Sequence, residues 1–136
     1  MTDCLFCKII NNEIPSYTIY EDDMFKVILD IAPATFGHAL IIPKRHAKDL
    51  YDLSDECASN LMLVAKKVAV AMKESLGIEG LNILQNNGAI ASQTVFHYHM
   101  HLIPRYENDS MRIGWEIVEQ EKSVFEKLVG MLALKV

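Results

Sequence analysis

Three of the five histidines in this 136-residue chain stand at every second position of one short stretch, residues 97–103 (His-Tyr-His-Met-His-Leu-Ile). Residues two apart on a β-strand point to the same face, so a strand would place three imidazoles on one side and Tyr98, Met100 and Leu102 on the other. On an α-helix the same spacing would turn successive rings about 200° apart. The pattern therefore predicts a strand with one histidine face and one apolar face, ended by Pro104, which cannot donate a ladder hydrogen bond.

This histidine face has three explanations: an ordinary solvent-facing surface, a metal site or a phosphate site. Solvent-facing strand positions usually mix Thr, Lys, Glu and Ser, which disfavours the first. A catalytic metal held by His97, His99 and His101 fits poorly, because alternate residues of one strand lie almost in a row. An imidazole can instead attack phosphorus when one nitrogen keeps its lone pair and the other donates a hydrogen bond. The middle residue, His99, is best placed for that role.

The composition is that of one soluble domain spanning residues 1–136. The chain is 51% hydrophobic with a mean hydropathy of +0.13, which excludes disorder. A net charge of −5 disfavours a nucleic-acid partner but permits a small phosphate pocket. We find neither an 18-residue apolar run nor a signal-peptide pattern, so the sequence predicts a cytoplasmic protein with no membrane partner.

The order of apolar segments predicts the fold class. Strands are expected at 17–20, 25–29, 38–42, 81–85 and 97–103. A long helix is expected at 55–76, with Ser54 as its N-cap and Gly77 just after its end. This order predicts an α+β fold, an antiparallel meander sheet with one long helix against a face. The core is expected to span about residues 4–106, and the C-terminal extension 107–136 carries a weaker amphipathic helix at 116–132.

The predicted long helix is apolar on nearly every side. Its core stripe at helical spacing consists of Leu61, Val64, Val68 and Met72. Only Lys66 and Lys67 are charged between residues 61 and 72. A second surface must therefore cover this helix, either the C-terminal segment or a second copy of the chain in a homodimer.

The segment before the histidine stretch suits an anionic ligand. It offers neutral hydrogen-bond donors at Asn86, Ser92, Gln93 and Thr94. No aspartate or glutamate lies between residues 80 and 106, so no carboxylate there would repel a phosphate. These four residues are therefore the candidate phosphate-binding side chains.

Three cysteines are too few, and odd in number, for a disulfide framework in a chain of this size. Cys4 and Cys7 form a C-x-x-C pair, which is compatible both with a metal site and with two ordinary buried thiols. Cys57 falls at the start of the predicted long helix and is expected to be a small hydrophobic residue of the core.

The histidine stretch resembles the His-x-His-x-His-x-x signature of the histidine-triad (HIT) superfamily, in which x is mostly apolar. The resemblance covers roughly residues 4–106. It is also carried by residues 6–10 (Phe-Cys-Lys-Ile-Ile), 13–15 (Glu-Ile-Pro), 42–46 (Ile-Pro-Lys-Arg-His) and 93–95 (Gln-Thr-Val), and by Pro33, Gly37, His38, Asn86 and Gly88. It implies a HIT-like fold and a homodimer paired through the long helix and a strand edge.

The resemblance implies a nucleotide-binding hydrolase or nucleotidyl transferase with a purine nucleotide as its small-molecule partner. His99 would attack the α-phosphate of a nucleoside phosphoramidate or a dinucleoside polyphosphate and hold the nucleotidyl group covalently. His101 would contact the α-phosphate and the leaving group, Asp30 would accept the ribose hydroxyls, and His38 would lie near the triad. Asn86, Gln93 and Thr94 would bind phosphate, and the base would lie against Phe25, Ile28 and Ile31. A non-catalytic nucleotide-binding or scaffold module is the alternative.

Some bacterial relatives, and the galactose-1-phosphate uridylyltransferases, carry a structural zinc. The resemblance implies that its ligands here would be Cys4, Cys7, His46 and His97. Such a closed Cys₂His₂ set would leave His99 and His101 free for chemistry. No organic cofactor is expected.

The sequence departs from the family pattern at Ser92 and over its C-terminal 30 residues, and it combines features of two branches of the family. Ser92 stands where many relatives have glycine. Pro104 and Arg105 resemble the dinucleoside-polyphosphate branch, whereas Asn86 resembles the phosphoramidate branch. The choice between these two substrate classes therefore stays open.

Overall fold

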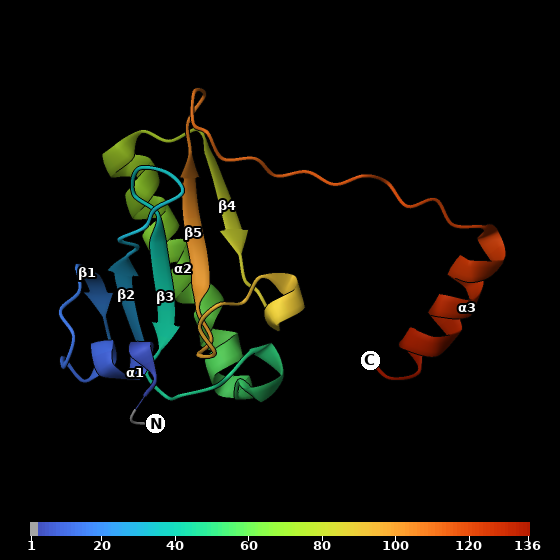
Figure 1. Cartoon of the computed structure of the whole chain (residues 1–136), viewed down its shortest axis with the longest axis horizontal. Helices are drawn as coiled ribbons and strands as arrows, with labels where there is room; N and C mark the ends of the chain where they lie inside the picture. Colours follow the sequence, from blue (N-terminus) through green and yellow to red (C-terminus); the bar gives the residue numbers. More distant parts are fainter. Residues whose placement is uncertain (1–2) are drawn as a thin grey trace.

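The computed structural model describes residues 3–136 and confirms the α+β architecture (Figure 1). Five antiparallel strands form one sheet in the order β1-β2-β3-β5-β4. The strands are β1 (Thr18–Glu21), β2 (Phe25–Leu29), β3 (Ala39–Pro43), β4 (Gly80–Leu84) and β5 (Met100–Arg105). The helices are α1 (Leu5–Ile10), α2 (Asp55–Leu76) and α3 (Lys122–Ala133), with 3₁₀ turns η1 (Leu50–Asp52) and η2 (Ala89–Ala91). Among residues 3–136, no helix has the length and hydrophobicity needed to span a membrane.

The two faces of the sheet build two different cores. The core on the α2 side includes Val27, Ile41, Leu61, Val68, Tyr98, Met100 and Leu102. The core on the α1 side consists of Phe6, Ile9, Ile28, Leu40 and Ile42. The predicted apolar row opposite the histidines is thus confirmed, because its three members pack under α2. The histidines consequently lie on the α1 side of the sheet.

The ends of α2 are those that the sequence predicts. Ser54 Oγ accepts a hydrogen bond from the Cys57 backbone N–H at 3.2 Å, which satisfies one of the free donors of the first turn. Gly77 closes the helix at φ +63°, a left-handed conformation in which glycine has no Cβ to clash. The two caps therefore set the ends of α2, whose buried residues Leu61, Val64, Val68 and Met72 face the sheet.

The histidine strand differs from the prediction at both ends. It begins only at Met100, so His97, which lies in a bend, and His99 precede β5 and are outside the sheet ladder. The N–H of Tyr98 donates instead to the carbonyl of Ala47 at 2.7 Å, which draws this segment away from the sheet. The strand also continues through Pro104 to Arg105. Beyond Leu102 it pairs with β4 alone, and an open edge tolerates a residue without an N–H.

The C-terminal segment does not cover α2 in this structure. Residues 107–121 form an extended arm that leaves the domain, and α3 lies at its far end with no buried residue (Figure 1). The predicted helix at 116–132 therefore begins six residues late, at Lys122. Ile117 and Val118 are β-branched, exposed and without packing partners that could enforce a helix. Met62 and Leu63, on the outer face of α2, remain exposed.

The tight approach of the loop before β3 to the end of α2 gives a stability prediction. Gly37 has φ +89°, and a Cβ built there would lie 2.8 Å from Leu76 Cδ1. We expect Gly37→Ala to lower the free energy of unfolding by about 1–3 kcal/mol, through backbone strain and this contact. Gly77→Ala, at φ +63° with nothing within 4 Å, would show the strain alone. Chemical denaturation that found Gly37→Ala no worse than Gly77→Ala would contradict the steric part of this account.

Candidate active site

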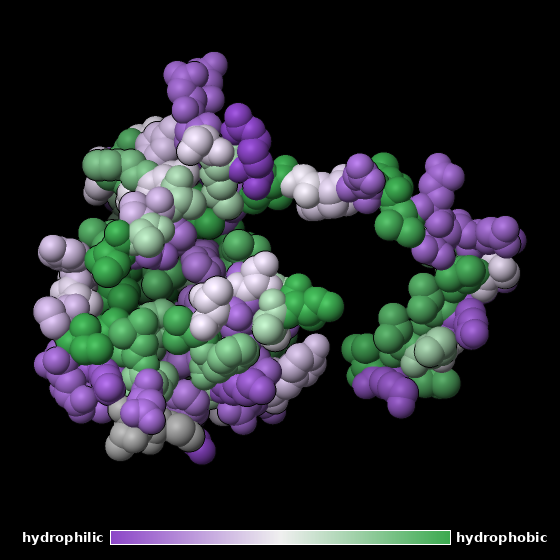
Figure 2. Space-filling view, in the orientation of Figure 1, coloured by the Kyte–Doolittle hydropathy of each residue, from purple (hydrophilic) through white to green (hydrophobic). Residues whose placement is uncertain are grey.

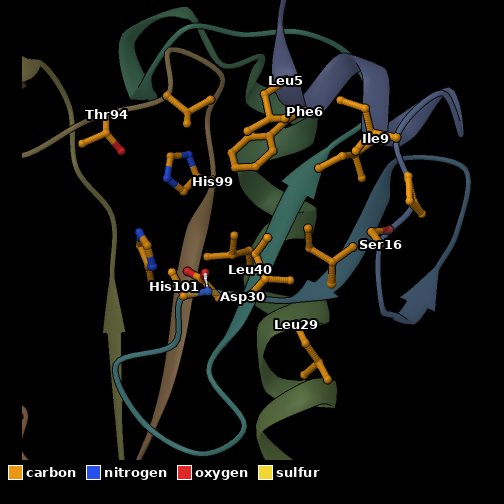
Figure 3. A pocket seen from close by; sticks show the side chains of 16 residues that line it. Leu5, Phe6, Ile9, Ser16, Leu29, Asp30, Leu40, Thr94, His99 and His101 are labelled. Carbon is orange, nitrogen blue, oxygen red and sulfur yellow. Dashed lines mark hydrogen bonds between the residues drawn. The ribbon is translucent and has the colours of Figure 1, made fainter.

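A cavity of about 350 Å³ opens on the α1 side of the sheet, between α1, the ends of β2 and β3, and β5 (Figure 3). Its wall is mainly apolar and includes Leu5, Phe6, Ile9, Ile14, Ile28, Leu29, Ile31 and Leu40. Its other end is polar and is formed by Asp30, Thr94, His99 and His101. A ligand with an apolar ring system and a charged group would match these two halves.

His99 is held in one orientation by its own backbone neighbourhood. Its Nδ1 lies 2.8 Å from the carbonyl oxygen of His97, so Nδ1 carries the proton and donates. Nε2 then keeps its lone pair on the side of the cavity that His99 lines. Burial lowers the pKa of His99, while the hydrogen bond to His97 and the charge of Asp30 oppose this effect. A neutral, oriented imidazole at pH 7 is the form required of a nucleophile.

His101 is oriented by a chain of hydrogen bonds that begins at the main chain. The N–H of Ala34 donates to His38 Nδ1 at 2.9 Å, so the proton of a neutral His38 must lie on Nε2. His38 Nε2 then donates to His101 Nδ1 at 2.8 Å, which leaves the proton of His101 on Nε2. His101 thus offers a donor where His99 offers a lone pair. The two rings are 5.1 Å apart, edge to face.

Burial keeps these histidines neutral in the free protein. It lowers the pKa of His101 to about 4, with the nearby His99 and His38 contributing. It also lowers the pKa of His38, against the opposing effect of Asp30. His38 itself is buried and does not line the cavity, so it contacts His101 from the protein side.

Asp30 is the one carboxylate that lines the described cavity. It follows β2 directly, and its Oδ1 accepts a hydrogen bond from the Ala32 N–H at 2.9 Å. Its Oδ2 lies 3.6 Å from His38 Nε2. These contacts fix the carboxylate between the apolar wall and His101, as Figure 3 shows.

The loop candidates separate into one cavity residue and three others. Thr94 lines the cavity. Gln93 is buried, accepts from the Gly88 N–H at 2.7 Å and donates to the Lys48 and Val95 carbonyls. Its amide therefore holds the loop together.

The remaining two candidates shape the same loop. Asn86 Nδ2 donates to the Ser92 carbonyl at 3.3 Å. Ser92 has φ +71°, a left-handed conformation that favours glycine. Many relatives have glycine at this position, and the positive φ of Ser92 explains why glycine is suitable there.

His97 lies on the α1 side of the sheet with the other two histidines, but its ring belongs to a different cluster of side chains. Its ring is fully buried and turns toward Cys4, Cys7 and His46. Within the described residues, a second cluster groups Asp30, His38 and His101. The three histidines therefore do not converge on one metal, which argues against the alternative of a catalytic three-histidine site.

Cys4, Cys7, His46 and His97 form a four-donor cluster whose ligand atoms all lie within 4.8 Å of one another. Cys4 Sγ is 3.4 Å from His97 Nδ1, Cys7 Sγ is 3.4 Å from His46 Nδ1, and the two Nδ1 atoms are 3.1 Å apart. A tetrahedral zinc ion with normal bond lengths separates its ligand atoms by about 3.3–3.8 Å. The two sulfur–nitrogen distances lie in this range and the nitrogen–nitrogen distance is slightly shorter, so the donor set fits zinc after a small outward shift of the two rings.

The surroundings of the cluster also favour a metal. His97 Nε2 donates to the Pro43 carbonyl at 2.7 Å, so its Nδ1 lone pair points at the two sulfurs. Burial and the hydrogen bond to Cys4 raise the pKa of the Cys7 thiol to about 11 in the metal-free chain. Binding of a cation would reverse this by favouring the thiolate.

One contributor was missed from the sequence. The ring of Phe6 lies edge to face with His99, with ring centres 4.9 Å apart, and also walls the cavity. Its position between Cys4 and Cys7 is the signal in the sequence, because a site formed by these two cysteines and His97 would also bring Phe6 close to the histidine strand.

Comparison with known proteins addresses the family. A family model described as the HIT domain matches residues 11–108. The chain is 47% identical over 126 residues to the adenosine 5'-monophosphoramidase of Saccharomyces cerevisiae, an overlap of 92% of this chain and 75% of the yeast protein. It is 42% identical over 109 residues to an adenylylsulfatase of Arabidopsis thaliana, an overlap of 80% and 55%.

Solved structures of relatives superpose closely. A HIT family protein from Bacillus anthracis has a TM-score of 0.93 at 42% identity, over 98% of this chain and 97% of its own. A Streptococcus mutans protein has a TM-score of 0.94 at 39% identity, over 99% and 86%. Residues 107–136 are about a fifth of this chain, so such scores require the arm and α3 to take the same course in both crystals.

A third solved structure bears on the metal cluster. It is a zinc-bound histidine-triad family protein from Mycobacterium smegmatis, with a TM-score of 0.76 at 38% identity, over 98% of this chain and 95% of its own. The family model, the identities and the shared fold agree. The chain belongs to the HIT family.

Proposed function

We propose that this protein is a nucleotide hydrolase that cleaves nucleoside phosphoramidates or dinucleoside polyphosphates at the α-phosphorus through a covalent nucleotidyl-His99 intermediate. The observation that carries the proposal is the 2.8 Å hydrogen bond from His99 Nδ1 to the His97 carbonyl, which leaves Nε2 as a free nucleophile. The yeast phosphoramidase and the plant adenylylsulfatase support a nucleotide hydrolase.

The two halves of the cavity match the two halves of a purine nucleotide. The base would lie against the apolar wall that includes Ile9, Ile28 and Leu40. Asp30 would accept hydrogen bonds from the ribose hydroxyls at the boundary between the halves. The phosphate would then lie beside Thr94 and the two catalytic histidines, His99 and His101, in a segment with no carboxylate between residues 80 and 106.

The reaction would proceed in two displacements at phosphorus. In the first, the His99 Nε2 lone pair forms a bond to the α-phosphorus, and the bond to the amine or phosphate leaving group breaks. The leaving group takes up one proton from solvent, and His101, whose Nε2 donor faces the same end of the cavity, stabilises it by a hydrogen bond. In the second, water attacks the phosphorus, the bond to His99 breaks, one proton is released and the nucleoside monophosphate leaves. The proton released from the attacking water thus returns to solvent and replaces the one taken up in the first step.

We expect His99→Ala to lower kcat for adenosine 5'-phosphoramidate by about four orders of magnitude, because the variant has no nucleophile. Binding of AMP should survive, since the apolar wall and Asp30 are unchanged. Mass spectrometry of a quenched wild-type reaction should locate an acid-labile adenylyl group on His99. Full activity in the variant, or an adduct on another residue, would refute the assignment, and AMP binding with no turnover by the wild type would favour the binding-module alternative.

The donor cluster is proposed to hold one structural zinc ion per chain on Cys4, Cys7, His46 and His97. Zinc bound there would cross-link the N-terminal knuckle to the approach of β5 and would leave His99 and His101 unligated. The zinc-bound mycobacterial relative supports a zinc ion in this fold.

Elemental analysis of reduced, chelator-free protein should find about one zinc per chain. Removal of zinc with a chelator should lower Tm by about 5 °C or more, because the bound metal contributes folding free energy. Cys7→Ser should abolish stoichiometric zinc, whereas Cys57→Ser should retain it, since Cys57 lies in the α2 core. Less than about a tenth of an equivalent in the wild type would leave Cys4 and Cys7 as ordinary thiols.

The homodimer is also proposed, with the outer face of α2 and the β4 edge as its interface. Met62 and Leu63 are 52% and 65% exposed, and β4 is an edge strand with Ile83 44% exposed. An open edge and an adjacent apolar helix face are a usual combination for a two-fold interface.

Sedimentation should therefore show a dimer at micromolar concentration. Leu63→Glu should raise the dissociation constant at least about tenfold, because it buries a charge in the interface. Val64, one residue along, is unsuitable for this test because it faces the core. Asp23→Lys, in the exposed turn between β1 and β2, is the control and should leave the dimer unchanged. A wild-type monomer would overturn the proposal.

A further inference from the structure

The C-terminal arm and α3 (residues 107–136, here called the C-terminal strap) carry an apolar surface that their own domain leaves uncovered (Figure 2). On α3 one stripe at helical spacing consists of Phe125, Leu128, Val129 and Leu132, which are 41–65% exposed. In the extended part, Trp115 is 84% exposed. Contiguous apolar surface of this extent on a soluble chain usually marks an interaction site.

The strap cannot keep its conformation alone. An isolated helix of 12 residues is marginal in water, because nucleation is costly and few hydrogen bonds follow it. The extended residues between Met111 and Glu121 have no regular secondary structure. A surface outside the chain's own domain must therefore stabilise α3.

The direction in which the strap leaves the domain is nevertheless fixed. Arg105, the last residue of β5, donates from Nε and Nη2 to the two carboxylate oxygens of Asp109 at 2.9 Å each. Arg105 Nη2 also donates to the Met111 carbonyl at 3.0 Å, and Asp109 accepts from the Tyr106 N–H. These hydrogen bonds fix the turn after β5. The strap then leaves the domain past β4, the edge strand of the sheet (Figure 1).

The strap takes the same course in the Bacillus and Streptococcus crystals, as the superpositions above require. Crystals of different proteins generally have different lattice contacts. A contact between the subunits of an oligomer that both proteins form would be the same in each crystal. The common course therefore points to a second copy of the same chain as the stabilising surface.

We propose that the C-terminal strap is exchanged between the two chains of the dimer: each strap crosses the β4 edge and packs its apolar stripe on the partner. This inference rests on the dimer proposed above. A second copy at the β4 edge lies on the side toward which the strap departs, so the exchange needs no refolding of the domain. Two straps related by the two-fold axis would clasp the dimer reciprocally.

Cross-linking of isotope-mixed dimers tests the exchange directly. Unlabelled and ¹⁵N-labelled wild-type chains are mixed, re-equilibrated and treated with an amine-reactive cross-linker. Links from Lys122, Lys127 or Lys135 of the strap to lysines of the domain are then analysed by mass spectrometry. Exchange predicts that about half of these links join one labelled and one unlabelled peptide. Links within single chains only, or no links from the strap to any domain, would overturn the proposal.

A matched pair of variants tests the apolar stripe. Leu128→Asp should raise the dimer dissociation constant about tenfold or more, while Ser123→Asp, which adds the same charge to the opposite face of α3, should change it less than about twofold. Equal effects of the two variants would contradict packing through the stripe. A monomeric wild type would refute the dimer itself. A dimer in which every strap-to-domain link joins peptides of the same isotope label would refute only the exchange. The adenylyl-His99 adduct is measured independently of both.

Discussion

His97 fixes the geometry of both sites by three separate interactions. Its main-chain carbonyl accepts from His99 Nδ1 and so determines that Nε2 of His99, the proposed nucleophile, keeps its lone pair. Its ring donates from Nε2 to Pro43 at the end of β3, and its Nδ1 faces the two cysteine sulfurs. Because the ring is fully buried, it cannot rotate without breaking these contacts. The orientation of His99 therefore depends on a residue that is held at both of its own ring nitrogens.

The electrostatics of the site follow from burying neutral imidazoles. A buried charge is costly, but a neutral ring with both nitrogens satisfied is not. In the described part of the chain, every fully buried side-chain nitrogen and oxygen has a hydrogen-bond partner. The histidines of the free site are thus neutral, and an anionic phosphate bound as proposed would favour protonation of His101, whose pKa burial lowers to about 4.

Alternation in the sequence predicted the faces correctly but not the hydrogen bonding. Tyr98, Met100 and Leu102 pack under α2 as expected, because a period of two depends only on an extended backbone. Whether that backbone also pairs with a neighbour depends on distant residues such as Ala47, which captures the Tyr98 N–H. For the same reason the pattern could not show that His97 turns toward the cysteines.

The polar loop shows a second limit of the sequence. Residue type marks Gln93 as a donor to phosphate, yet both ends of its amide are occupied by Gly88, Lys48 and Val95. A buried amide that is already satisfied has little to offer a ligand. His38 is similar, since only the contact with Ala34 reveals that it orients His101. Local composition identified the residues near the site, but their roles are set by partners far along the chain.

The wall of the cavity depends on a helix too short to be stable by itself. α1 has six residues, so tertiary contacts must hold it. At one end Cys4 and Cys7 belong to the donor cluster. At the other, the buried Lys26 of β2 donates to the Ile9 carbonyl at 3.2 Å and to Asn12 at 3.1 Å. Phe6 lies between these two anchors, against both His97 and His99. A metal ion bound at Cys4 and Cys7 as proposed would therefore stabilise more than the N-terminus, because it would also hold the Phe6 ring that packs against His99.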